Sequence, residues 1–183
     1  MARKLAPGRT GANGFSMKPK RGRLGLGLGV ALLVLLLDQA VKLYIVNAVM
    51  TPPRVIPVTS FLDLVMVWNR GVSFGLFGDG GVGPYLLAGL AVAIAAILVA
   101  WLRKAETGLL GLGLGLVVGG AIGNAIDRLH WGAVADFVSI SLPFIPLRLF
   151  NPWPAFNVAD AAISIGVILV LVDGLFPPGK TLK

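Results

Sequence analysis

The sequence predicts an α-helical polytopic membrane protein with four transmembrane helices and a small extracytoplasmic β-sheet. Of its 183 residues, 56% are hydrophobic and only 13% are charged, whereas soluble domains are about 45–50% apolar and about 25% charged. Four apolar runs each have about the 20 residues that a bilayer-spanning helix needs. The basic residues are concentrated on one side of these runs, and the length allows one compact domain.

The first apolar run, residues 24–46, follows a polar, basic tail at residues 1–23. A basic tail can bind nucleic acid, but next to an apolar span it marks the cytoplasmic end. A basic start and an apolar run also describe a signal peptide. We reject that interpretation because the run is long enough to cross a bilayer and contains Asp38 and Lys42. Four residues apart, these two would share a helix face and form an ion pair, which we interpret as structural.

Three further spans are expected, together with a sheet between the first span and the second. The spans are residues 82–102, 107–126 and 158–176, and a cytoplasmic tail at 177–183 ends the chain. Between the first two spans, residues 55–77 mix β-branched and aromatic residues with Pro and Gly, and residues 65–70 alternate as in a strand. We therefore expect a short sheet that lies as a cradle on the outer membrane surface.

The second outer segment, residues 127–157, contains the strand-like run FVSISLPF followed by several prolines. In the third span before it, glycine recurs every four residues, at Gly111, Gly115, Gly119 and Gly123. Such a smooth ridge lets a neighbouring helix approach closely, so we interpret it as a packing surface.

The orientation follows from the distribution of charge. With both termini inside, eleven of the sixteen basic residues lie on the cytoplasmic side and four in the outer segments, as the positive-inside rule requires. Two of the eight acids, Glu106 and Asp173, are then cytoplasmic. The other six lie at or near the outer side: Asp38, Asp63, Asp79, Asp127, Asp136 and Asp160. Any active site is therefore expected at the outer face.

Few kinds of chemistry are available to this sequence. It has no cysteine and one histidine, so we expect no disulfide, no thiolate nucleophile, no metal site and no cofactor. A Ser–His–Asp triad would need His130, but no nucleophile elbow accompanies any serine. Ser–Lys catalysis would need Lys42, which Asp38 occupies. Two carboxylates sharing a proton remain, one activating water and the other polarising a carbonyl.

Local charge selects between the acids. Asp127 is followed by Arg128, which would hold it ionised as its nearest counter-charge. Asp136 and Asp160 have no adjacent base and have small or apolar neighbours, so they are the acids best placed to have raised, coupled pKa values. Taken alone, this leaves a purely structural role for the pair open, since perturbed acids are not always functional.

Five segments between residues 24 and 176, in this order, resemble the lipoprotein signal peptidase family, also called signal peptidase II. They are Asp38–Lys42, Asn69–Phe74, Gly119–Arg128, Gly132–Phe137 and Phe156–Asp160. A single motif would be weak evidence, but five in order on four spans are highly specific.

The resemblance implies an aspartyl endopeptidase of the bacterial inner membrane. That family removes signal peptides from prolipoproteins before a diacylglyceryl-modified cysteine, which implies prolipoprotein and membrane lipid as partners, and no nucleic acid. By resemblance, Asp136 and Asp160 are catalytic. The expected substrate-binding or supporting residues are Asn69, Gly71, Asn124, Arg128, Asn157, Asp127, Asp38 and Lys42. We expect a monomer.

Two features depart from the family pattern. The segment between Phe137 and Phe156 is Pro-rich and long, and Ala135 replaces a bulkier β-branched residue. Two other functions compete with a peptidase: a channel or transporter that uses membrane carboxylates, and an assembly scaffold that uses the glycine ridge. Both predict no cleavage of a lipid-modified precursor. A conducting path would also need polar groups reaching both faces, whereas the acids gather at one.

Overall fold

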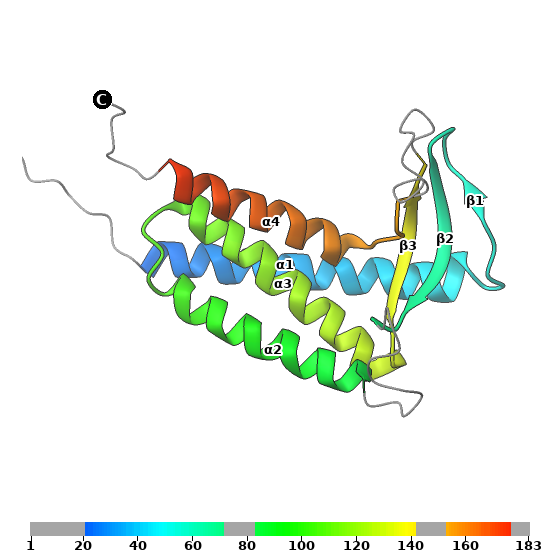
Figure 1. Cartoon of the computed structure of the whole chain (residues 1–183), viewed down its shortest axis with the longest axis horizontal. Helices are drawn as coiled ribbons and strands as arrows, with labels where there is room; N and C mark the ends of the chain where they lie inside the picture. Colours follow the sequence, from blue (N-terminus) through cyan, green and yellow to red (C-terminus); the bar gives the residue numbers. More distant parts are fainter. Residues whose placement is uncertain (1–20, 72–82, 142–152, 177–183) are drawn as a thin grey trace, which may run out of the picture.

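The computed structural model describes residues 21–71, 83–141 and 153–176, and contains four long helices lying side by side (Figure 1). They are α1 (Arg21–Tyr44), α2 (Gly83–Leu102), α3 (Gly108–Trp131) and α4 (Val158–Leu175). All four are long and apolar enough to cross a membrane. The predicted four-helix membrane fold is therefore confirmed.

Two helices differ in extent from the predicted spans. A π-helical turn, Ile45–Val49, continues α1. Helix α3 ends at Trp131, five residues beyond the predicted 126, where Gly132 adopts the left-handed conformation (φ 69°) and its N–H closes the last turn on the Arg128 carbonyl. Glycine is the usual residue for such a helix end because it has no Cβ. Residues 1–20 and 177–183, which include most of the two predicted tails, lie outside the described residues.

A three-stranded antiparallel sheet covers one end of the helices (Figure 1). Its strands, in spatial order, are β1 (Ile56–Pro57), β2 (Leu62–Asn69) and β3 (Val134–Ile140), which confirms the predicted small sheet. The predicted strand FVSISLPF begins three residues earlier than expected, so that Asp136 lies within β3. Val134–Phe137 are all buried, so this part lacks the alternation by which a half-exposed strand is recognised. Residues 72–82 and 142–152 lie outside the described part of the chain.

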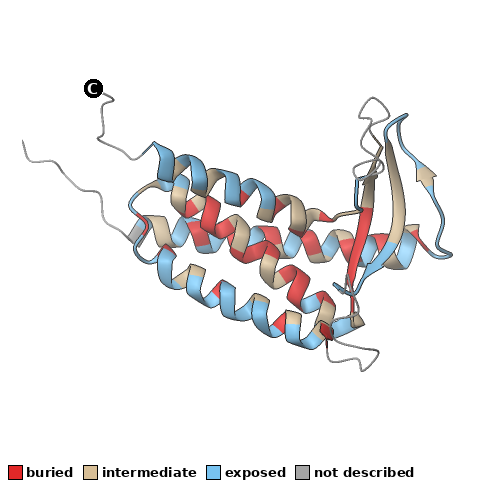
Figure 2. Ribbon diagram, viewed as in Figure 1, coloured by how far each residue is buried: buried red, intermediate tan, exposed pale blue. Residues whose placement is uncertain are grey.

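Helix α3 is the centre of the bundle, and buried segments recur along most of its length in Figure 2. A Cβ on Gly119 would lie 2.5 Å from the Ala31 carbonyl oxygen of α1, and one on Gly115 would collide with the backbone of Gly27. The predicted glycine ridge is therefore a packing surface for α1. A second face packs on α4, where a Cβ on Gly120 would lie 2.5 Å from the Ala159 carbonyl oxygen. Close approach on both sides fixes how the polar ends of α1, α3 and α4 meet.

Candidate active site

A buried cluster of three ions, Asp38, Lys42 and Asp127, joins α1 to α3 beneath the sheet. The Lys42 ammonium lies 2.8 Å from Asp38 and 2.7 Å from Asp127, and all three side chains are fully buried. The predicted Asp38–Lys42 pair is thus present, with Asp127 added to it. Asp38 also accepts the backbone N–H of Ala159 at 2.9 Å, which ties the cluster to the first turn of α4.

The expected pairing of Asp127 with Arg128 is wrong, because consecutive helical residues point about 100° apart and do not face each other. Asp127 pairs with Lys42, while the Arg128 Nη1 donates to the Asn124 carbonyl at 3.1 Å. The Arg128 Nε is buried and has no hydrogen-bond partner within the described residues. Arg128 therefore has donor capacity to spare beside the acids.

Asp136 and Asp160, the acid pair, come from different elements and are joined by Asn157. Asp136 lies on β3, and Asp160 lies in the first turn of α4, whose N-cap is Asn157. The Asn157 side-chain oxygen accepts the Asp160 N–H at 3.0 Å, and its backbone N–H donates to the Asp160 carboxylate at 3.3 Å. Its side-chain nitrogen donates to the Asp136 carboxylate at 2.7 Å. One residue thus holds both carboxylates.

Two further asparagines direct amide nitrogens at the pair. Asn69, at the end of β2, donates to Asp136 at 3.0 Å while its oxygen accepts the N–H of Gly71, which has φ 72°. Asn124, on α3, donates to Asp160 at 2.7 Å while its oxygen accepts from Lys42 at 2.9 Å. A lysine ammonium and a backbone N–H can only donate. They therefore fix the orientation of these amides, with nitrogen toward the carboxylates.

Burial, together with the nearby negative charge of Asp160, raises the pKa of Asp136 from 3.8 to about 6, although the hydrogen bonds from Asn69 and Asn157 and the positive charge of Lys42 oppose the shift. The Asp136 side chain is only 1% exposed, so its ionised form loses most of its hydration. An acid with a pKa near neutrality can carry a proton at one stage of a reaction and release it at another.

Known proteins resemble this chain over most of its length. The family described as Signal peptidase (SPase) II matches residues 30–176. The chain belongs to the signal peptidase II family. A lipoprotein signal peptidase of Methylobacterium radiotolerans is 49% identical over 159 residues, covering 84% of this chain and 88% of that protein. One of Rhodopseudomonas palustris is 48% identical over 153 residues, covering 82% of this chain and 92% of that protein.

Solved structures agree with this assignment. A bacterial membrane enzyme determined by the in meso method at 1.9 Å resolution superposes with a TM-score of 0.68 at 27% identity, covering 84% of this chain and 94% of that one. Signal peptidase II enzymes are aspartic peptidases, and this chain is one of them. Membership of this enzyme family decides against the channel and scaffold interpretations.

All ten site residues predicted from the sequence lie at the sheet end of this signal peptidase II chain, and Gly71, which follows β2, is exposed there beside Leu87 of α2 and Arg128. The other acids in the described part of the chain do not join them. Asp63 lies on β2 opposite Ser139, and Asp173 accepts a hydrogen bond from Thr107 at the other end of the bundle. Asp79 and the Pro-rich stretch at 142–152 lie outside the described residues. His130 packs edge-on against Trp131, with ring centroids 5.1 Å apart.

The sequence analysis missed one residue, Gln39. Its side-chain nitrogen donates to Asp127 at 2.9 Å, and to Asp38 and the Gly123 carbonyl at 3.2 Å each. Gln39 therefore braces the ion cluster against α3. The only signal for it was its place beside Asp38 in the DQAVK motif, since its main partner is 88 residues away.

Proposed function

We propose that this protein removes signal peptides from diacylglyceryl-modified prolipoproteins at the outer face of the bacterial inner membrane, with Asp136 and Asp160 as its catalytic residues. It would act as a monomer with both termini in the cytoplasm. The observation that carries the choice of residues is the contact of Asn157 with both carboxylates, which holds the two acids at one place. The names of the curated relatives support the substrate class.

In this mechanism the pair shares one proton. Asp160 lies at the N-terminus of α4, where the helix dipole stabilises negative charge, so it acts as the base. It takes a proton from water, and the water oxygen attacks the carbonyl carbon of the scissile peptide bond. Asp136, whose pKa is raised to about 6, carries the shared proton, hydrogen-bonds the carbonyl oxygen and then protonates the leaving nitrogen.

Arg128 is proposed to bind the substrate beside the pair. Its guanidinium has a buried Nε without a partner in the described part of the chain, and Nη2 lies near Gly71. A peptide carbonyl oxygen is the acceptor that this group lacks. Gly71 has a positive φ, which favours glycine there, and a Cβ at this position would collide with the Leu87 side chain of α2 at 2.5 Å and lie 3.7 Å from the Arg128 Nη2.

The test is cleavage of a lipid-modified precursor peptide by the purified protein. Asp136→Asn and Asp160→Asn should each lower the rate per folded molecule by at least about 10²–10⁴-fold, because an amide can neither accept the proton of water nor supply one. Asp63→Asn is the matched control, an acid on the same sheet that should be dispensable. Activity should persist in chelator, since the sequence offers no Cys and a single His.

Two outcomes would overturn the assignment. If Asp127→Asn is stable but inactive while Asp136→Asn cleaves at a near-normal rate, Asp127 and Asp160 are the reacting pair. If chelator abolishes cleavage and a divalent ion restores it, the reaction depends on a metal.

A further inference from the structure

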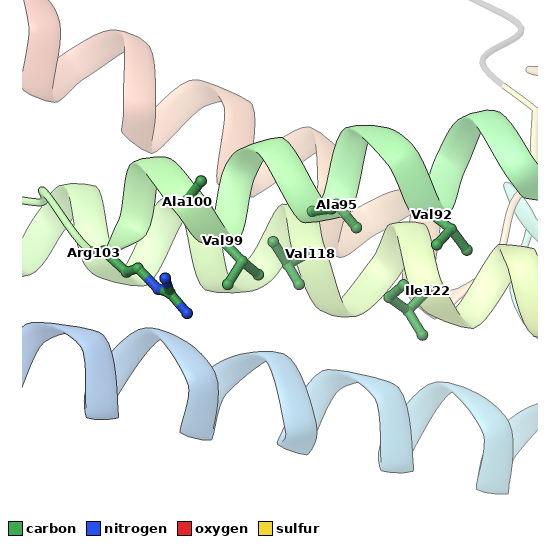
Figure 3. A pocket seen from close by; sticks show the side chains of 8 residues that line it. Val92, Ala95, Val99, Ala100, Arg103, Val118 and Ile122 are labelled. Atoms are coloured by element: carbon green, nitrogen blue, oxygen red, sulfur yellow. The ribbon is translucent and has the colours of Figure 1, made fainter.

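A shallow apolar groove of about 450 Å³ runs along α2 and α3 (Figure 3). Its main lining residues are Val92, Ala96 and Val99 of α2, Val118 and Ile122 of α3, and Arg103. Arg103 lies just beyond the last residue of α2, at the end of the bundle opposite the sheet. The groove is thus hydrocarbon-like along its length and cationic at one end.

The size of the groove limits what it can hold. From Val92 to Arg103 the helix rises about 16 Å, and a helix of that length and about 10 Å diameter occupies about 1,300 Å³. The groove offers about a third of that volume. An extended hydrocarbon chain fits such a space, whereas a second helix could only rest against it.

The positive charge at the end of the groove indicates what kind of molecule the bound chain belongs to. Arg103 is exposed, and both ion pairs in the described part of the chain belong to the Asp38–Lys42–Asp127 cluster. Its guanidinium is therefore not neutralised by a described carboxylate, and it suits a phosphate well because it can donate two parallel hydrogen bonds. A signal peptide would bring its own basic start to this end, where like charges repel.

We propose that this groove binds one acyl chain of an anionic phospholipid whose headgroup phosphate pairs with Arg103. Its cationic end, at Arg103, lies at the opposite end of the bundle from the acid pair, and the binding of lipid there does not depend on the proposed reaction. It would fix a bilayer lipid between α2 and the rest of the bundle.

The experiment measures lipid binding to the purified full-length protein by native mass spectrometry, titrating phosphatidylglycerol and phosphatidylcholine separately. The wild-type protein should bind the first molecule of phosphatidylglycerol about fivefold more tightly, the factor that one basic residue near an anionic surface provides. Arg103→Gln should abolish this preference. Lys104→Gln, which removes the same charge from the adjacent residue outside the groove, should keep it.

A second pair of variants tests whether the acyl chain of the lipid lies in the groove. Ala96→Phe fills the groove from an exposed position and should weaken the binding of both lipids, whereas Ala93→Phe, on the same helix but outside the groove, should not. Equal melting temperatures of the two variants show that folding is unaffected. The proposal is wrong if the two lipids bind equally, if Lys104→Gln acts like Arg103→Gln, if Ala96→Phe leaves binding unchanged, or if a precursor peptide displaces the lipid.

Discussion

Replacing Lys42 by Met should destabilise this protein more than any other single change in the ion cluster. Lys42 is the only cation between two carboxylates, and all three side chains are fully buried. Removing one partner of a buried ion pair costs about 3–5 kcal/mol, because the other charge remains without compensation. Here two carboxylates lose their partner, so we expect a cost of about 5 kcal/mol, against a total stability of about 5–15 kcal/mol for a typical domain.

Asp127→Asn should cost less, although it removes a charge from the same cluster. Lys42 keeps Asp38 at 2.8 Å, so no buried ion is left without a partner. The cost is then that of a hydrogen bond to a charged group, about 1.5–3 kcal/mol. The predicted order of melting temperatures is therefore wild type, then Asp127→Asn, then Lys42→Met.

The assay is thermal unfolding in detergent, with cleavage rate per folded molecule as a second readout. Lys42→Met also removes the donor that orients the Asn124 amide, so the remaining folded molecules should cleave slowly. Lys104→Met, which changes an exposed lysine, is the control. Neutralising the whole cluster with Lys42→Met, Asp38→Asn and Asp127→Asn together should recover part of the lost stability. The reasoning fails if Lys42→Met melts with the wild type, or if the triple variant is no more stable than Lys42→Met.

Three other predictions concern pH, topology and packing. The pKa of Asp136 is raised to about 6 in the folded protein, from its ordinary value of about 3.8. The stability that the Asp136 carboxyl contributes is therefore fully present below pH 3.8 and is lost as the pH rises through 6. Asp136→Asn should be more stable than wild type at pH 8, by about 3 kcal/mol, and no more stable at pH 3.5. The wild-type rate should follow a bell-shaped pH profile whose two apparent pKa values belong to the pair. Reporter fusions at Ser60 should be extracytoplasmic and fusions at Ala105 cytoplasmic, and the reverse would overturn the topology. Gly120→Ala, whose Cβ would lie 2.5 Å from the α4 backbone, should cost about 1–3 kcal/mol, whereas Gly89→Ala, which meets nothing within 4 Å, should not destabilise the protein in the same melting assay.

The sequence predicted the four helices because their apolar runs are long and the bilayer sets their length. It also predicted the glycine ridge and the Asp38–Lys42 pair, since a four-residue spacing on a helix fixes which side chains are neighbours. The pairing of Asp127 was mispredicted because its partner, Lys42, comes from another helix. Adjacency in sequence is a poor guide to such contacts, which depend on how closely α1 packs on α3.

The ends of elements were predicted less well, for two local reasons. The third span was predicted to end at residue 126, before Asp127 and Arg128, but the helix continues because Asp127 is neutralised by Lys42 and Arg128 reaches back to the Asn124 carbonyl. Gly132 was the available signal for the true end, because glycine commonly follows the last helical residue. The start of strand β3 was predicted three residues too far along the chain, because the first four residues of the strand are buried and show no alternation.

The start of α4 and the assembly of the acid pair depend on the same residue, Asn157. Its amide caps the helix and reaches Asp136 on β3 at the same time. A chain whose fourth helix began one residue earlier or later would turn this amide by about 100° about the helix axis and lose the contact with Asp136. With Asp136 and Asp160 as the proposed catalytic residues, proteolytic activity would depend on correct insertion of the last helix. A chain still being threaded into the bilayer, or inserted out of register, would then be an inert membrane protein rather than an uncontrolled protease.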